Sequence, residues 1–201
     1  MPKSPSKSPS KSLQSPRLPE LSPDNFTPAQ KALADSIASG PRGVFKLSGP
    51  FAIYLHAPEF GELAQKLGGH VRYKTSVPPR LSEFAILCTA QFWKAQYEWT
   101  AHAVIAEKQG VKPETIRAIQ AGRPPKSSPK DEMAIYAFVK ELYGKRRVSA
   151  PTFNRVKKLL GDAGTVELVG ILGYYAMVSM TLNVFKAPLP EGVKPGFAEP
   201  K

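Results

Sequence analysis

The chain contains a single cysteine, Cys88, in 201 residues. One thiol cannot form an intramolecular disulfide, so the fold does not depend on an oxidising compartment. The same count excludes an intrachain dithiol redox couple and a cysteine-rich zinc site. We expect Cys88 to be a small apolar residue of the core.

Histidine is also scarce, with His56, His70 and His102 widely separated along the sequence. None of them belongs to a metal-ligand motif such as H-E-x-x-H, so the sequence does not indicate a metal site. We interpret His56 and His70 as surface or packing residues. His102 differs from them because of the residues that precede it.

Acidic residues are absent from the first nineteen positions, which carry Lys3, Lys7, Lys11 and Arg17. The repeated Lys-Ser-Pro-Ser unit has too little apolar surface to offset the entropy of ordering, so we expect residues 1–24 to form a disordered tail. The stretch lacks the apolar segment of a secretory signal, and its prolines disfavour a transit-peptide helix. A tail without specific function is our first interpretation; phosphorylation or weak contact with nucleic acid is the alternative.

The formal net charge of the whole chain is +12. A basic surface favours anions in general, including carboxylate substrates, phosphates, nucleic acid and anionic membranes, and does not choose among them. Hydrophobic residues make up 42% of the chain, which is enough for one domain with a sizeable core.

Helical patterns fill the chain from about residue 27, and no period-two strand pattern stands out, so we predict an all-α protein. Thr27-Pro28 is typical of a helix start, and Gly40-Pro41 of a helix end. Gly68-Gly69 could interrupt the helix that we expect over residues 58–73. The further helices that we expect cover residues 51–56, 58–73, 81–109 with a kink near Ala95, 112–122, 131–143, 151–160 and 165–185.

The last of these helices is apolar on nearly every face. Residues 168–185 carry no charge, and this length is just sufficient to span a membrane. Ser179, Thr181 and Asn183, together with the absence of a second such segment, argue against that role. We expect the helix to be buried centrally or at a subunit interface, with no membrane as a partner.

Glu98 and His102 are the most informative pair in the chain, within the sequence YEWTAH. Their i, i+4 spacing places the carboxylate and the imidazole on one face of a helix. A histidine held by a carboxylate near apolar residues can act as an acid/base pair, because its pKa lies near neutrality. The same spacing also fits a solvated surface pair. Glu83 supplies a second carboxylate on the preceding helical stretch.

The sequence PPRLSEFAILCTAQFWKAQYEWTAH, followed by IAEKQGV, resembles the carboxymuconolactone decarboxylase family of the alkylhydroperoxidase-D-like (AhpD-like) superfamily. GTVELVGILGYYAMVSMTLNVF resembles the final helix of that family. The resemblance implies a cofactor-free, AhpD-like helical bundle that forms homotrimers or homohexamers. It covers a domain of about residues 25–190, followed by a C-terminal tail at 191–201.

The peroxidase branch of that superfamily carries the pattern E…CxxCxxxH. On this chain the glutamate falls on Glu83 and the histidine on His102, whereas the two cysteine positions are Ala95 and Glu98. Peroxide reduction by that branch needs a thiolate nucleophile and a resolving thiol, so this departure disfavours thiol peroxidase activity. The resemblance therefore implies the decarboxylase branch, a cytoplasmic lyase of aromatic compound catabolism.

The named reaction of that branch converts 4-carboxymuconolactone to the enol-lactone with loss of carbon dioxide. The resemblance implies that His102 donates the proton, that Glu98 orients it or relays the proton, and that Glu83 is a further acid/base group. The partner is then a small-molecule carboxylate, and neither a metal nor a cofactor takes part.

Arginine is the residue type that we expect to bind the substrate carboxylate, since a guanidinium binds that group through two parallel hydrogen bonds. Arg80 is the first candidate and Arg72 the second, with Tyr73 and Trp99 as walls of the pocket. Alternatively, Arg80 pairs with Glu83 on its own helix, and Trp99 belongs to the core.

Two further functions stay open, because membership of a superfamily fixes the scaffold and not the substrate. One is a different small-molecule enzyme with the same pocket: an oxidoreductase or peroxidase-like enzyme, an isomerase or a hydrolase. The other is a non-enzymatic protein whose basic tails bind nucleic acid or an acidic protein. The core offers no helix-turn-helix pattern and no aromatic stacking platform, which disfavours nucleic acid as a partner.

Overall fold

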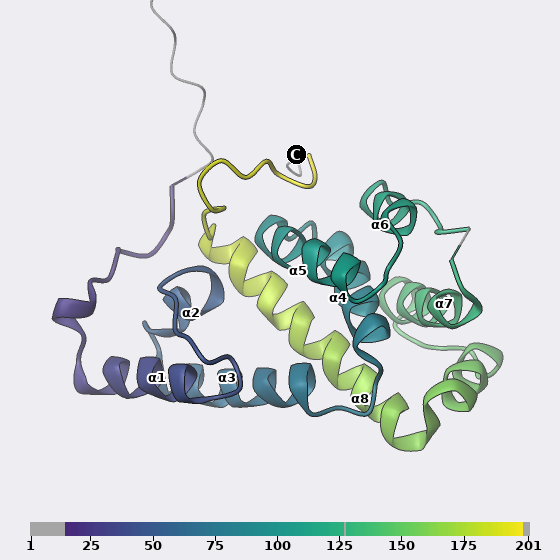
Figure 1. Cartoon of the computed structure of the whole chain (residues 1–201), viewed down its shortest axis with the longest axis horizontal. Coiled ribbons are helices and arrows are strands. Elements are labelled where there is room, and N and C mark those ends of the chain that lie inside the picture. Colours follow the sequence, from purple (N-terminus) through teal and green to yellow (C-terminus); the bar gives the residue numbers. More distant parts are fainter. Residues whose placement is uncertain (1–14, 127, 199–201) are drawn as a thin grey trace, which may run out of the picture.

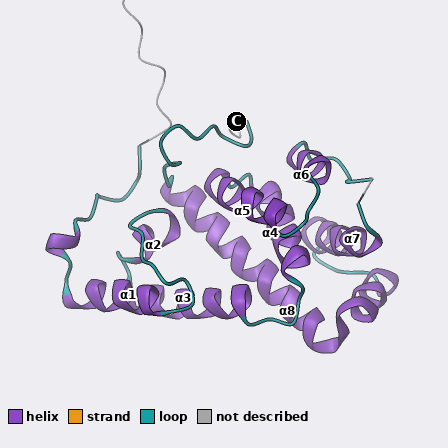
Figure 2. Cartoon of the chain, in the orientation of Figure 1, coloured by secondary structure: helices purple, strands orange, loops and turns teal. Residues whose placement is uncertain are grey.

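The computed structural model describes residues 15–126 and 128–198 (Figure 1). Within these ranges the chain is helical and contains no strand, as the sequence predicts (Figure 2). Residues 1–14, most of the expected N-terminal tail, lie outside the described residues. The elements are η1 (Pro23–Asn25), α1 (Pro28–Ser39), α2 (Gly49–Tyr54), α3 (Pro58–Tyr73), α4 (Pro79–Trp93), α5 (Gln96–Lys108), α6 (Pro113–Gln120), α7 (Lys130–Lys145) and α8 (Ala150–Phe185).

The start of α1 follows the sequence signal, because Thr27 and Gln30 form a reciprocal capping box. By contrast, α3 continues without a break through Gly68-Gly69. A Cβ at Gly68 would lie 2.0 Å from the hydroxyl oxygen of Tyr174, so this glycine allows α3 and α8 to approach closely. The alternative of an interruption at Gly68-Gly69 was therefore wrong.

The single kinked helix expected over residues 81–109 is two separate helices, α4 and α5. Helix α4 ends where Lys94 adopts the left-handed conformation, with φ of 52°, and α5 begins at Gln96. The chain reverses at this turn, and the two helices pack against each other. The reversal matters for the site, because it brings residues of α4 opposite residues of α5.

Helix α8 runs diagonally through the molecule and packs against α2, α3, α4, α5 and α7 (Figure 1). Gly161, with φ of 72°, interrupts its helical geometry, between the two helices that the sequence predicts at 151–160 and 165–185. By length and composition α8 could cross a membrane, but half of its most apolar window is buried within the protein. Central burial is the environment that the sequence analysis expects for this helix.

Two clusters of apolar side chains form the core. The larger lies among α4, α5, α7 and α8 and includes the fully buried Phe84, Leu87 and Ile171. The smaller joins α1, α2 and α3 through residues such as Ile37. Met177 of α8 contacts both clusters, so α8 holds the two parts of the molecule together.

Both expected tails contact the helical domain where the structure describes them. The backbone N–H of Arg17 donates to the carbonyl of Phe185 at 3.2 Å, and its guanidinium donates to the carbonyl of Val184 at 2.8 Å. Near the other end, Gln96 exchanges two hydrogen bonds with the backbone of Phe197. Residues 15–21 and 196–197 thus lie against the domain.

Candidate active site

The imidazole of His102 lies between two carboxylates. Its Nδ1 is 2.6 Å from Oε2 of Glu83 on α4, and its Nε2 is 3.1 Å from Oε1 of Glu98, one turn earlier on α5. All three side chains are at most 7% exposed. An ionised carboxylate accepts hydrogen bonds and donates none. Both contacts are therefore hydrogen bonds when both ring nitrogens of His102 carry a proton.

The surroundings of His102 favour its charged form. Burial by itself lowers the pKa of this histidine, but the charge of Glu98 and the hydrogen bonds to Glu83 and Glu98 outweigh burial and raise the pKa to about 9. The ring of Tyr175 meets the imidazole edge to face, with centroids 5.1 Å apart. His102 is therefore an imidazolium at neutral pH, held in one orientation by two carboxylates and an aromatic ring.

A cavity of about 360 Å³ opens in front of His102 and Glu98. Glu83 does not line it, because this carboxylate contacts the other nitrogen of the ring. The walls come from the loop between α1 and α2 and from α2, α3, α5 and α8. The other lining residues are Arg42, Val44, Lys46, Ser48, Pro50, Phe51, Arg72, Tyr73, Tyr97, Ala101, Tyr174, Tyr175 and Val178.

Three cations line this cavity: Arg42, Lys46 and Arg72. In the part of the chain that the structure describes, none of them forms an ion pair with a carboxylate. The guanidinium of Arg42 lies over the ring of Phe51, 4.9 Å from its centroid, and that of Arg72 lies 5.3 Å from the centroid of Tyr73. Stacking of this kind orients a guanidinium and leaves N–H donors for an anion.

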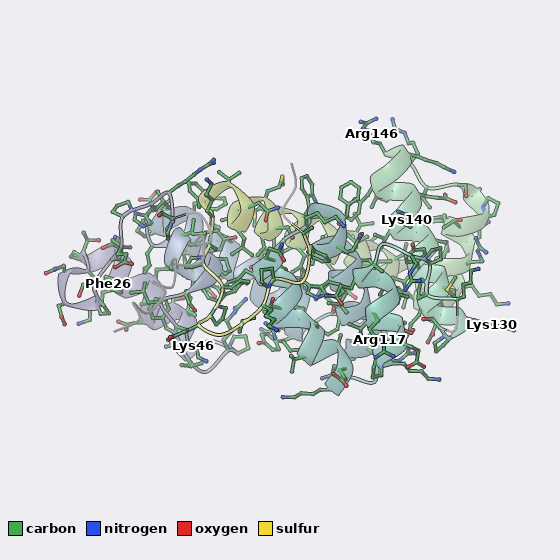
Figure 3. The ribbon with its side chains drawn as sticks, turned by 90° about the horizontal axis from the view of Figure 1, so that it is seen from above. Phe26, Lys46, Arg117, Lys130, Lys140 and Arg146 are labelled. Atoms are coloured by element: carbon green, nitrogen blue, oxygen red, sulfur yellow. The ribbon has the colours of Figure 1, made fainter. Side chains whose placement is uncertain are left out.

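The remaining basic residues are elsewhere. Figure 3 places Lys46 on the side of the molecule formed by α1 to α3, and Lys140 and Arg146 toward the opposite end. The chain therefore also carries positive charge far from the cavity.

The structure brings together four of the residues that the sequence singles out: His102, Glu98, Arg72 and Tyr73 line one cavity. Glu83 lies directly behind His102.

The structure does not bring Arg80 or Trp99 to the cavity that contains His102. Arg80 instead binds Asp131 and Glu132 of α7, so the alternative partner, Glu83, was also wrong. Trp99 is 4% exposed and packs against Phe197, with ring centroids 5.0 Å apart.

The lining residues that sequence reasoning missed include two cations, Arg42 and Lys46, and two tyrosines, Tyr174 and Tyr175. The first two lie in an irregular loop, where no periodicity indicates which way a side chain points. The tyrosines lie in the most apolar helix, where the pattern indicates burial and not a cavity.

The one cysteine of the chain lies outside this cavity. Cys88 is buried on α4, where burial raises the pKa of its thiol, and it lines a different cavity of about 90 Å³. Among residues 15–126 and 128–198 no group of histidines, cysteines and carboxylates is suited to hold a metal ion. Glu83 and Glu98 each point at a different nitrogen of His102, so the three groups do not converge on a shared point.

The helical architecture is that of the AhpD-like fold. The sequence profile of the carboxymuconolactone decarboxylase family matches residues 58–139, from the start of α3 to the middle of α7. Over this segment the chain is similar to that family, and its fold is AhpD-like. No curated protein sequence matches it.

Solved structures share the fold at low sequence identity. A protein of unknown function from Agrobacterium tumefaciens, named after the antioxidant defence protein AhpD, has a TM-score of 0.62 at 14% identity, over 69% of this chain and 95% of that one. A cysteine-to-alanine variant of the debrominase Bmp8 in complex with 2,3,4-tribromopyrrole has a TM-score of 0.67 at 12% identity, over 90% of this chain and 95% of that one. The apo form of the same debrominase has a TM-score of 0.62 at 13% identity, over 86% of this chain and 91% of that one.

Proposed function

We propose that the protein is a cofactor-free enzyme that decarboxylates a small carboxylated lactone or a related organic acid, with His102 as the general acid. The observation that carries this proposal is the position of a charged histidine in the wall of a cavity that also holds three cations without carboxylate partners. Such a cavity attracts an anion and offers it a proton.

Arg42, Lys46 and Arg72 replace Arg80 as the groups that bind the substrate carboxylate. A guanidinium can donate two parallel hydrogen bonds to a carboxylate, and two arginines near each other suit a substrate with more than one acidic group. Arg80 is engaged with two carboxylates of α7 and has no place in this step.

The chemical step needs one proton. When the bond between the ring carbon and the carboxylate breaks, carbon dioxide leaves and the electron pair passes into the lactone carbonyl as a dienolate. The imidazolium of His102 delivers a proton to carbon, directly or through Glu98, and the neutral ring then takes a proton from water. Glu83 positions the imidazole through Nδ1, and the nearby cations stabilise the developing oxyanion.

The second candidate is another proton-transfer reaction in the same cavity, such as isomerisation of an unsaturated acid. The likeness of the fold to a debrominase supports keeping this candidate, because one scaffold serves different reactions. A thiol mechanism has less support, since Cys88 lines a different cavity.

Assembly into a homotrimer or homohexamer is part of the proposal. Exposed apolar side chains on α3 and α8 support it, including Leu63 at 71% and Val166 at 73% exposure. A cytoplasmic location is also part of it, because one cysteine leaves the fold independent of intramolecular disulfides.

Carbon dioxide release from 4-carboxymuconolactone and a panel of related lactone and β-keto acids tests the proposal. We expect release by the wild type and a loss of at least about 100-fold in His102→Ala. His70→Ala is the matched control, because His70 is exposed on α3 and should leave the rate unchanged. If no acid in the panel releases carbon dioxide although the protein is folded, or if His102→Ala keeps full activity, the proposal is wrong.

A further inference from the structure

A second cavity, of about 310 Å³, lies beside the one that contains His102. Residues 16–21, α2 and the end of α8 enclose it. Most of its lining is apolar, and we call it the apolar annex. It is lined by Pro16, Leu18, Pro19, Glu20, Leu21, Leu47, Ser48, Gly49, Ala52, Ile53, His56, Phe185, Ala187 and Pro188.

The loop before α2 forms the wall between the two cavities. Val44 and Lys46 line the His102 cavity, and Leu47 lines the apolar annex. Of the described residues, Ser48 is the one that lines both. The two cavities therefore meet at an exposed serine and not at a packed layer of core.

Tyr97 closes this junction from the other side. Its hydroxyl donates to Oγ of Ser48 at 3.3 Å, and it also lines the His102 cavity. Gly49 has a φ of 57°, and a Cβ there would lie 2.5 Å from the ring of Tyr97. Between the two cavities the structure thus places one long hydrogen bond beside a glycine.

We propose that the apolar annex receives the apolar tail of an amphipathic carboxylate whose head group binds Arg42 and Arg72 in the His102 cavity. The inference deepens the proposed function, on which it rests for the placement of the head group, by assigning the substrate class. The occupant is one molecule that passes Ser48. Each cavity has the size of a small ligand site, and the annex buries alkyl or aryl carbon.

The charges on the two sides fix the direction of binding. The His102 cavity holds three cations, Arg42, Lys46 and Arg72, against one carboxylate, Glu98, which His102 already binds. The apolar annex holds one carboxylate, Glu20, and His56 among the described residues. A carboxylate is attracted by the first set and repelled by Glu20. An amphipathic acid therefore places its head toward His102 and its tail in the annex.

Calorimetric titration with linear monocarboxylates from acetate to octanoate tests this inference without any chemical turnover. Once the chain is long enough to pass Ser48, we expect affinity to rise roughly fourfold for each further methylene, because each buried methylene contributes a similar free energy. A flat dependence of affinity on chain length would overturn the inference.

Variants locate the tail. Leu47→Asp adds a charge to the apolar annex, and Ala52→Phe fills it; both should bind acetate as the wild type does and lose the gain from longer chains. Val104→Asp is the matched control, because Val104 is exposed on α5 outside both cavities, and it should keep that gain. If circular dichroism shows either annex variant folded and the gain from longer chains persists, the tail binds elsewhere and the inference is wrong.

The outcome is separable from that of the proposed function. Release of carbon dioxide that depends on His102, together with no effect of chain length on binding, rejects the annex and leaves the decarboxylase proposal intact. A chain-length gain that disappears in Leu47→Asp supports the annex even if no acid is decarboxylated.

Discussion

Two ion clusters in this protein have the same composition: one cation between two carboxylates. Arg80 lies between Asp131 and Glu132, and His102 lies between Glu83 and Glu98. Both clusters use α4, and both contain a carboxylate that is almost completely buried. They differ in the cation and in the space beside it.

Arginine keeps its proton at every physiological pH, and the cluster of Arg80 connects α4 to α7 without lining the His102 cavity. Histidine can give its proton away, and His102 faces a cavity of about 360 Å³. The comparison shows that paired charges alone do not define a site. A group that exchanges protons must also have room for a reactant.

Amide substitutions in the two clusters should separate chemistry from structure most clearly. Glu98→Gln removes the negative charge that faces His102 Nε2, and we expect turnover to fall by about 10²-fold or more. Asp131→Asn makes the same change beside Arg80 and should leave turnover unchanged. Rates of carbon dioxide release per folded protein measure both, and equal losses in the two variants would show that the clusters do not differ in function.

Replacing Arg80 tests whether its ion pairs stabilise the fold. Arg80→Met leaves Glu132, which is 1% exposed, without its partner, and we expect the free energy of unfolding to fall by about 3 kcal/mol. Urea denaturation followed by circular dichroism measures the change. Turnover at a temperature where the variant is folded should match the wild type, and a loss of activity there would place Arg80 in the mechanism after all.

The free energy of unfolding should change with pH because of the His102 cluster and not because of the Arg80 cluster. The pKa of His102 is raised from 6.5 to about 9, so its stabilising effect is complete below about pH 6.5 and is lost as the pH rises through about 9. We expect the free energy of unfolding to fall by on the order of 3 kcal/mol across this window. His102→Gln should flatten the curve measured by urea denaturation, and an equally steep curve in the variant would assign the effect to other groups.

Cys88, on the same helix as Glu83 and Arg80, gives the smallest expected effect. Cys88→Ala removes a buried sulfur and should cost about 1 kcal/mol of stability. Turnover should be unchanged, because the thiol lines a different cavity. A large loss of turnover at full folding would return a thiol mechanism to consideration.

Much of the fold is predictable from the sequence because helix signals are local. The capping box at Thr27 and the left-handed glycine at Gly161 lie where composition indicates a boundary. Gly68 shows the limit of such signals: a glycine that breaks a helix and a glycine that admits a neighbouring ring look the same in a sequence. Only the position of Tyr174, more than a hundred residues later, distinguishes them.

The sequence signal for the site was strongest where its residues share a helix or a motif. Glu98 and His102 are one turn apart, and the family pattern adds Glu83. The choice of Arg80 failed because its partners, Asp131 and Glu132, are fifty residues away on α7. Arg42 comes from a loop whose side-chain directions depend on packing between α2, α3 and α8.

The turn between α4 and α5 sets the direction of α5 and also its rotation about its own axis. Each residue added to a helix rotates the rest of that helix by about 100° and advances it by about 1.5 Å. One residue inserted in the first turn of α5, between Gln96 and Glu98, would leave Glu98 and His102 in contact, since both follow the insertion, but would turn them together away from Glu83. Substitutions in the turn before α5 are compatible with the site as long as they accept its left-handed residue, whereas an added residue at the start of α5 is not.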